Sequence, residues 1–291
     1  MKQNLKPRVL MIAAMALFGT IAPFVRLIPV SSGELALYRA VMASVLLSLT
    51  LPFTGRRIPF SRIGRQIPLL LVSGVAMGVN WILLFEAYKH TTVSVATLSY
   101  YFAPVLVTAV CPVLFKERLT PKQILCFVMS TVGLVLITAT GSAGGGNHTV
   151  GILFALGAAV LYATVVLLNK FIQGADGIHR TLLQFLAAAA ILFPYVLLTG
   201  GVTLGGMPAL GWVSLLTVGI VHTGLTYCMY FTALKELSGQ QAAILSYIDP
   251  LVAILISVTV LGEPMTLWQA AGGILILGFT LWNELPVGKK G

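Results

Sequence analysis

Ten apolar segments, each about 20 residues long, follow one another along this chain and are separated by short polar connections. An α-helix needs about 20 apolar residues to cross a bilayer core about 30 Å thick, so each segment is long enough to span a membrane. The segments occupy residues 8–28, 34–53, 67–87, 93–114, 120–140, 149–172, 178–199, 209–234, 240–261 and 266–283. The pattern therefore predicts an all-α polytopic membrane protein with ten transmembrane helices.

The composition excludes a soluble fold. Hydrophobic residues make up 58% of the 291 residues and charged residues only 9%, whereas soluble domains contain about 25% charged residues. The three cysteines are too few and too far apart to indicate a disulfide framework or a zinc site. Neither an ATP-binding glycine loop nor a zinc-protease or serine-hydrolase motif occurs. We therefore expect no metal, no cofactor and no enzyme of these common classes.

The charges predict an orientation in the membrane. The net charge of +10 would suggest a nucleic-acid partner in a soluble protein, but in so apolar a chain it indicates that cations collect in cytoplasmic loops. If the N-terminus is cytoplasmic, fifteen of the eighteen Lys and Arg residues lie on the cytoplasmic side. The other three are Arg26 and Lys89, on the outer side, and Arg39, within the second span. We thus expect both termini in the cytoplasm, a multi-pass protein of the inner plasma membrane, and no nucleic-acid partner.

The two halves of the chain repeat each other. Phe18, Thr20 and Arg26 return about 144 positions later. A longer series returns about 146 positions on, and Pro, Glu, Tyr and Gln matches at one offset are hard to obtain by chance. The first series returns as Tyr162, Thr164 and Lys170. The second runs through Phe85, Ala87, Lys89, Ala96, Tyr101, Pro104, Glu117, Thr120 and Gln123, and returns as Phe231, Ala233, Lys235, Ala242, Tyr247, Pro250, Glu263, Thr266 and Gln269.

Each half holds five spans, an odd number, so the second copy is predicted to be inverted relative to the first. Secondary transporters use this plan, with the substrate site near the midplane between the repeats. The predicted organisation is a first repeat at residues 1–140, a linker at 141–148, a second repeat at 149–285 and a cytoplasmic tail at 286–291.

The ends of two Pro-bearing helices carry a family resemblance. Leu114-Phe115-Lys116-Glu117 and Val260-Leu261-Gly262-Glu263, together with Arg39 in the second span, resemble the EamA type of the drug/metabolite transporter superfamily. The resemblance implies that helices 1–4 and 6–9 surround a central cavity while helices 5 and 10 pack peripherally, where a homodimer could form. It also implies export of amino acids or other small metabolites. Small four-helix relatives exchange protons through a Glu in the first helix, but no carboxylate stands near Thr20 or Thr164.

Ionisable residues at bilayer depth are the candidate site residues, because each costs about 2.5–3.5 kcal/mol on insertion scales. Asp249 is the strongest candidate, since Pro250 removes a backbone donor and loosens the helix beside it. Ala103 stands at the matching position of the first repeat, which predicts an electrically asymmetric cavity. His222, near the middle of span eight, could relay protons or simply bond between helices. Asp249 and His222 are therefore the proton-coupling candidates.

Four further charged residues have competing interpretations. Arg39 and Glu86 lie at similar depth, which predicts an ion pair with a structural or gating role, but Arg39 could instead meet a substrate carboxylate. Glu117 and Glu263 are expected to brace the turns into spans five and ten.

Aromatic residues near span centres suggest a pocket that holds an apolar or cationic ligand, although each ring could equally serve in packing. The predicted substrate-binding set is Asn80, Trp81, Tyr101, Tyr162, His222, Tyr227, Tyr247 and Asp249. Two glycines predict close helix packing instead of a site. Gly74 and Gly78 form a small-xxx-small pair that would let span three approach a neighbouring helix closely.

These features favour a secondary transporter that exports amino acids or other small organic solutes by alternating access, with proton coupling as one option. The partners are then a small organic solute and the lipid bilayer. A polytopic membrane enzyme is one alternative, but it would need a denser cluster of acids, histidines or metal ligands than Asp249 and His222 provide. A nonenzymatic receptor or assembly subunit is another, and it requires no inverted symmetry.

Overall fold

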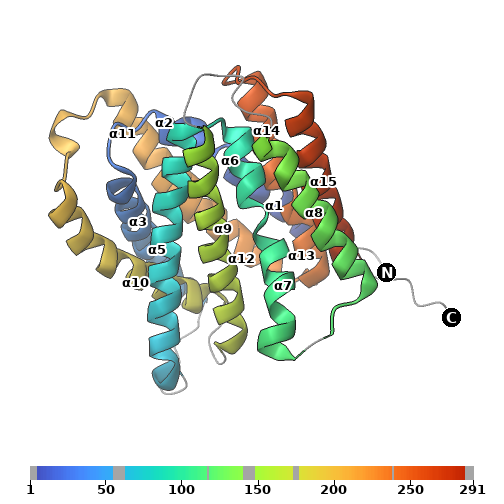
Figure 1. Cartoon of the computed structure of the whole chain (residues 1–291). Helices are drawn as coiled ribbons and strands as arrows, with labels where there is room; N and C mark the ends of the chain where they lie inside the picture. Colours follow the sequence, from blue (N-terminus) through green and yellow to red (C-terminus); the bar gives the residue numbers. More distant parts are fainter. Residues whose placement is uncertain are drawn as a thin grey trace.

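The computed structural model describes residues 5–54, 63–116, 118–139, 148–172, 177–237 and 239–285, and these residues form a helical bundle without a β-strand (Figure 1). In the first half the helices are α1 (Leu5–Gly19), α2 (Ile21–Arg26), α3 (Ser32–Thr54), η1 (Gly64–Gln66), α5 (Ile67–His90), α6 (Val93–Tyr100), α7 (Ala103–Phe115) and α8 (Pro121–Ala139). In the second half they are α9 (His148–Phe171), α10 (Gly177–Thr199), η2 (Leu204–Gly206), α11 (Ala209–Leu216), the π-helix η3 (Thr217–Leu225), α12 (Thr226–Leu234), α13 (Gly239–Ser246), α14 (Ile248–Thr259) and α15 (Leu267–Glu284).

Nine stretches of the described residues are long and apolar enough to cross a membrane, and they coincide with the first nine predicted spans. They are Lys6–Arg26, Ser32–Leu49, Ile67–His90, Val93–Leu114, Pro121–Thr138, His148–Phe171, Gly177–Thr199, Ala209–Leu234 and Gln241–Thr259. The tenth predicted span is the 18-residue helix α15, whose polar ends, with Gln269 near its start and Asn283 and Glu284 at its end, lower its mean hydropathy. Within the predicted linker, His148 begins α9, while residues 141–147, the tail 286–291 and Glu117 lie outside the described residues.

Three spans are broken, and a proline explains each break. Proline lacks a backbone N–H and its ring clashes with the carbonyl four residues earlier. Counting back four residues from Pro23, Pro104 and Pro250 gives the last residues of α1, α6 and α13, which are Gly19, Tyr100 and Ser246. The breaks at Tyr101 and Tyr247 are therefore repeat counterparts, as the matched prolines predict.

The break after α1 has no counterpart in the second half. Leu167 stands 144 positions after Pro23, and α9 runs through it without interruption. Conversely, span eight contains η3, while its counterpart α5 is a continuous α-helix. The hydroxyl groups of Thr223 in η3 and of Thr226, directly after it, donate to the carbonyls of Val218 and Val221, five residues earlier, at 2.7 and 2.8 Å. The two halves thus differ in span one and span eight.

Helices from the two halves pack in reciprocal pairs. The helix α5 packs on α9, and α1 packs on α12; α10 packs on α5, and α3 packs on η3. The helices α8 and α15 lie side by side at one edge of the bundle (Figure 1). They are antiparallel, because Lys122 near the start of α8 donates to the carbonyl of Leu285, just after α15, at 2.5 Å.

Close helix packing at Gly74 and Gly78 is confirmed. A Cβ atom built on Gly74 would lie 2.5 Å from the carbonyl oxygen of Gln184 on α10, and one on Gly78 would lie 3.2 Å from Leu192. The helices α5 and α10 therefore lie so close together that only glycine fits at position 74.

Glu263 braces the turn into span ten, as predicted, because the Ser257 hydroxyl at the end of α14 donates to its carboxylate, but it does not cap α15. Thr266 and Gln269 cap α15 reciprocally as a capping box. Glu263 also accepts a hydrogen bond from the backbone N–H of Val93 at 2.8 Å. Val93 is the first residue of α6, so the carboxylate serves a helix of the other half of the chain.

Candidate functional site

A cavity of about 450 Å³ lies in the interior of the bundle, within the range of about 300–1,000 Å³ typical of small-molecule sites. Its walls come from α1, α2, α3, α5, α6, α7, α9, α10, α12, α13, α14 and α15. Most of the spans in both halves therefore contribute to one cavity.

The cavity is closed at one end and open at the other. Trp81, Phe85 and Thr97 line the closed end and are at most 5% exposed. At the opposite end, Asn169 near the end of α9 and Arg180 near the start of α10 are partly exposed lining residues. By the distribution of cations along the chain, this open end is the one predicted to face the cytoplasm.

Seven of the eight predicted binding residues line this cavity, and Arg39 lines it too. The seven are Asn80, Trp81, Tyr101, Tyr162, Tyr227, Tyr247 and Asp249. Asn80 is already engaged, because its side-chain amide donates to the carbonyl of Ala158 on α9 at 2.6 Å. Ala103 and Asp249, the counterparts in the two repeats, both lie in the lining.

Asp249 sits in the first turn of α14, directly after the break at Tyr247. The hydroxyl group of Tyr101 donates to Oδ2 of Asp249 at 2.7 Å. The rings of Tyr101 and Tyr247 lie 6.3 Å apart, so the two helix breaks face each other. Gly19 packs on the backbone of Asp249, because a Cβ built there would lie 2.6 Å from the Asp249 carbonyl oxygen. The breaks in α1, α6–α7 and α13–α14 therefore converge around this carboxylate.

Arg39 is held by the cavity wall rather than by Glu86. Its Nε donates to Oγ1 of Thr223 in η3 at 3.2 Å, and its guanidinium carbon lies 4.5 Å from the ring centroid of Trp81. The predicted ion pair with Glu86 does not form. Glu86 instead pairs with Lys89, one turn along the same helix, at 3.1 Å, and does not line the cavity. The helical period turns Glu86 toward Lys89 and away from the interior.

Arg39 and Asp249 line the same cavity as opposite charges, and within the described part of the chain neither forms an ion pair. Arg39 is 6% exposed. A buried charge is stabilised by hydrogen bonds and by an opposite charge. Both groups can therefore receive the opposite charges of one ligand.

His222 does not line the cavity, contrary to its prediction as a substrate-binding residue. Its ring is buried where two irregular segments meet, the break between α1 and α2 and the π-helix η3. Nε2 lies 3.0 Å from the hydroxyl oxygen of Thr20, and Nδ1 lies 3.2 Å from the carbonyl oxygen of Thr217. The ring of Phe24 packs beside it, with centroids 5.1 Å apart. The extra residue in the π-helix turns His222 toward α2 rather than toward the interior.

Aromatic rings form much of the cavity wall. Tyr100 and Tyr162 are 5.5 Å apart between ring centroids, and Phe18 and Tyr227 are 5.2 Å apart. Such surfaces hold apolar groups and cations, while tyrosine hydroxyls supply hydrogen bonds.

Several lining residues escaped sequence reasoning. Tyr230 follows Tyr227 by three positions on α12, and Tyr88 follows Trp81 by seven on α5, so helical periodicity could have found both. Arg180 was counted among the cytoplasmic loop cations, yet it lines the open end of the cavity and donates to the carbonyl of Asn169 at 3.2 Å. No sequence signal distinguished it from the other loop cations.

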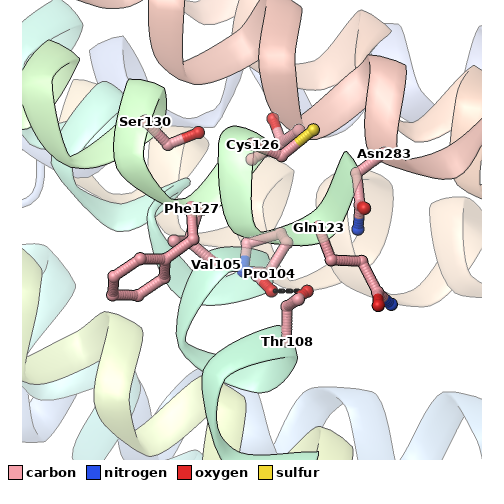
Figure 2. Close-up of a pocket in the computed structure, with 9 residues that line it drawn as sticks. Pro104, Val105, Thr108, Gln123, Cys126, Phe127, Ser130 and Asn283 are labelled. Carbon is pink, nitrogen blue, oxygen red and sulfur yellow. Dashed lines mark hydrogen bonds between the residues drawn. The ribbon is translucent and has the colours of Figure 1, made fainter. Parts of the chain in front are cut away.

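A second, smaller pocket lies between α7, α8 and α15 (Figure 2). Its volume of about 10 Å³ has room for about one water molecule. It borders the free thiol of Cys126, and the Thr108 hydroxyl beside it donates to the carbonyl of Pro104 at 3.0 Å. Among the described residues, no three His, Cys, Asp or Glu side chains are grouped as metal ligands would be.

A family model described as the EamA-like transporter family matches the chain twice, at residues 6–139 and 149–283. The chain is similar to the uncharacterized transporter YxxF of Bacillus subtilis, with 28% identity over 94% of this chain and 88% of that protein. It is also similar to an uncharacterized transporter of Archaeoglobus fulgidus, with 29% identity over 92% of this chain and 93% of that protein.

A solved structure, titled only as the crystal structure of a protein, aligns with a TM-score of 0.66 and 19% identity. The alignment covers 94% of this chain and 95% of the other. At this level of identity, the similarity concerns the fold alone.

Proposed function

Because this chain belongs to the EamA-like transporter family of membrane transporters, we propose that it is a secondary transporter for a small zwitterionic organic solute such as an amino acid. The observation that carries this proposal is the pair of opposite charges, Arg39 and Asp249, in one aromatic cavity without an ion pair between them. The ammonium group of the solute would meet Asp249, and its carboxylate would meet the guanidinium of Arg39.

The proposed architecture is two inverted five-helix repeats with α15 as the tenth span and both termini in the cytoplasm of an inner-membrane protein. The family model matches each half separately, which supports the division into repeats. The reciprocal packing of helices and the antiparallel α8 and α15, which occupy equivalent places in the halves, support the inversion. In this orientation the cavity opens to the cytoplasm, so solute would load there and leave outward by alternating access.

Proton coupling is a further part of the proposal, with Asp249 and His222 as the carriers. The carbonyl of Thr217 can only accept, so Nδ1 of His222 keeps its proton. Nε2 can accept from the Thr20 hydroxyl when the ring is neutral, or donate to it when the ring is charged. In the second case Thr20 donates to the carbonyl of Leu17 at 2.9 Å. Arg39 is held beside this segment, because its hydrogen-bond partner Thr223 follows His222 in sequence.

Flux into proteoliposomes tests the solute class. The panel pairs each amino acid with its decarboxylated amine and its deaminated acid. Wild-type protein should prefer the zwitterions, and Asp249→Asn and Arg39→Gln should each reduce their flux at least about tenfold, because each removes a charged hydrogen-bonding partner. Glu86→Gln is the matched control, since Glu86 lies outside the cavity lining and should leave flux unchanged.

Equal flux of zwitterions by wild type and Asp249→Asn would remove Asp249 from the site. Chemical turnover of a solute without flux would favour the membrane-enzyme alternative. For the coupling, a pH gradient should drive flux in wild type but not in Asp249→Asn or His222→Ala. If both variants respond to the gradient as wild type does, the coupling proposal fails.

A further inference from the structure

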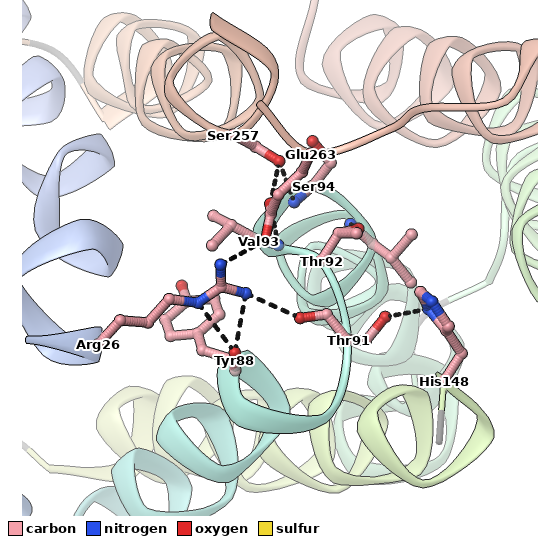
Figure 3. Close-up of polar contacts among 10 residues, drawn as sticks. Arg26, Tyr88, Thr91, Thr92, Val93, Ser94, His148, Ser257 and Glu263 are labelled. Carbon is pink, nitrogen blue, oxygen red and sulfur yellow. Dashed lines mark hydrogen bonds and ion pairs between the residues drawn. The ribbon is translucent and has the colours of Figure 1, made fainter. Parts of the chain in front are cut away.

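Figure 3 shows a polar cluster around Arg26 and Glu263. This cluster lies at the end of the bundle opposite the cavity mouth. Nη1 of Arg26, the last residue of α2, lies 2.5 Å from Oε1 of Glu263, in the connection between α14 and α15. This ion pair joins the first half of the chain to the second half. The mouth lies at the other end of the same helices, since α9 begins beside the cluster at His148 and reaches the cavity mouth near Asn169.

The cluster rests directly on the closed end of the cavity. Nε and Nη2 of Arg26 donate to the carbonyl of Tyr88 at 3.1 and 2.9 Å, and Nη2 also donates to the carbonyl of Thr91 at 3.1 Å (Figure 3). The side chain of Tyr88 lines the cavity. A solute leaving at this end would therefore have to pass the contacts of Arg26.

Glu263 holds the other side of the cluster. Its Oε2 accepts from the backbone N–H of Val93 and from the hydroxyl of Ser257, and Ser257 Oγ also accepts from the N–H of Ser94 at 3.2 Å (Figure 3). The connection after α14 is thereby tied to the start of α6. Together, Arg26 and Glu263 link α2, the end of α5, the start of α6 and the end of α14.

We infer that Arg26 and Glu263 are the gating residues that close the outer end of the transport pathway and separate when the cavity opens outward. This inference rests on the proposed transport function. The Arg26 side chain is 30% exposed and that of Glu263 is 10% exposed, so water can replace their mutual contacts when they part. Protein hydrogen bonds that can be exchanged for hydrogen bonds to water contribute a modest net free energy, which suits contacts that break in each cycle.

The alternative is that the Arg26–Glu263 ion pair never separates and only stabilises the fold. A second ion pair at the same end of the bundle serves as a matched control. Lys89 and Glu86 form an ion pair at the same end of the bundle, but both belong to α5. Because this pair joins no two segments, its loss should not open the cavity.

The first experiment measures access to the cavity without any solute. Cys111, Cys126 and Cys228 are replaced by Ala, and Leu84, which lines the cavity on α5, is replaced by Cys. Right-side-out vesicles are then treated with a membrane-impermeant maleimide. Arg26→Gln and Glu263→Gln should each speed labelling by about fivefold. This change corresponds to removing about 1 kcal/mol of the free energy that stabilises the closed state. Lys89→Gln should label at the starting rate.

The second experiment locks the gate. Arg26→Cys and Glu263→Cys are combined in the same cysteine-free background and bridged with a short thiol-specific cross-linker that a reductant cleaves. Bridging should suppress both outer labelling and solute flux at least about tenfold, and reduction should restore both. Melting curves of each variant establish that the protein stays folded.

Unchanged labelling in Arg26→Gln and Glu263→Gln, or wild-type flux through the bridged protein, would overturn the gate. If labelling responds as expected but no solute of the panel crosses the membrane, the gate stands and the proposed transport function fails. The labelling arm thus separates the two failures.

Discussion

Asp249 and Arg39 are held in place by different chemistry, although both are charged residues within apolar spans. Asp249 has a hydrogen bond from Tyr101 and sits where two broken helices meet. Arg39 is stabilised by an aromatic ring and by one hydroxyl group, that of Thr223. Delocalised guanidinium charge tolerates such an environment better than an ammonium would. Each charged side chain is thereby positioned in the wall of the cavity.

Tyr101→Phe tests the positioning of Asp249. The substitution keeps the ring but removes the 2.7 Å hydrogen bond, so the carboxylate should lose orientation. Zwitterion affinity should fall by about tenfold, consistent with about 1.5–3 kcal/mol for a hydrogen bond to a charged group. Binding of a radiolabelled amino acid to purified protein measures the change. Tyr247→Phe is the control, because its ring lies in the same wall without a hydroxyl contact to Asp249. Equal losses in the two variants would argue against a specific role for the Tyr101 hydroxyl.

Among the helices, the main asymmetry between the two halves lies where span one meets span eight. Pro23 breaks the first span at Thr20, and the π-helix η3 distorts the eighth span at His222. These two segments meet through the 3.0 Å contact between Thr20 and His222. The counterpart helices α9 and α5 are regular and pack closely on each other. Irregular helices of this kind commonly occur at functional sites, because they place side chains that a regular helix cannot.

Gly74→Leu tests the close packing of α5 against α10. A side chain at this position would meet the carbonyl oxygen of Gln184, so the helices must move apart. We expect a loss of about 1–3 kcal/mol in stability, seen as a lower thermal unfolding midpoint in detergent. Gly278→Leu on α15 adds the same side chain where nothing lies within 4 Å, and its midpoint should stay near that of wild type. A similar midpoint for both variants would contradict the close contact at Gly74.

At the scale of the whole molecule, the orientation of the protein in the membrane determines which compartment the cavity opens to and which side the Arg26–Glu263 cluster faces. Among the described residues, Lys170 near the end of α9 and Arg180 near the start of α10 lie toward the open end of the cavity, the side that the positive-inside rule predicts to be cytoplasmic. The outer cations Arg26 and Lys89 instead form ion pairs at the closed end. If the proposed orientation is right, the cavity opens to the cytoplasm and is closed to the outside.

Cysteine accessibility tests this orientation. In a chain without its native cysteines, Lys89→Cys should react with an impermeant maleimide in intact cells, because the exposed Lys89 lies at the predicted outer end. Lys235→Cys, at an exposed repeat-related position in the second half, should react only after the membrane is permeabilised. The opposite pattern would invert the topology and make the cavity open outward.

The sequence by itself determined the class of the protein, nine of its spans, the loosened helix beside Pro250 and seven of the residues that line the cavity. These features depend on local physics: the length of apolar runs, the missing N–H of proline and the period of the helix. Repeat matching also paired Tyr101 with Tyr247 before their rings were seen to face each other.

Only the tertiary structure decided which charges share a cavity and which pair with one another. Arg39 and Glu86 stand at similar depth in the sequence, yet helix rotation turns Glu86 to Lys89 and Arg39 to Trp81. Depth along a span follows from counting residues, whereas the face of a helix that meets the interior depends on its packing partners. For the same reason, His222 lies behind the cavity wall and Glu263 reaches across the bundle to Arg26, because both contacts join segments that are distant in sequence.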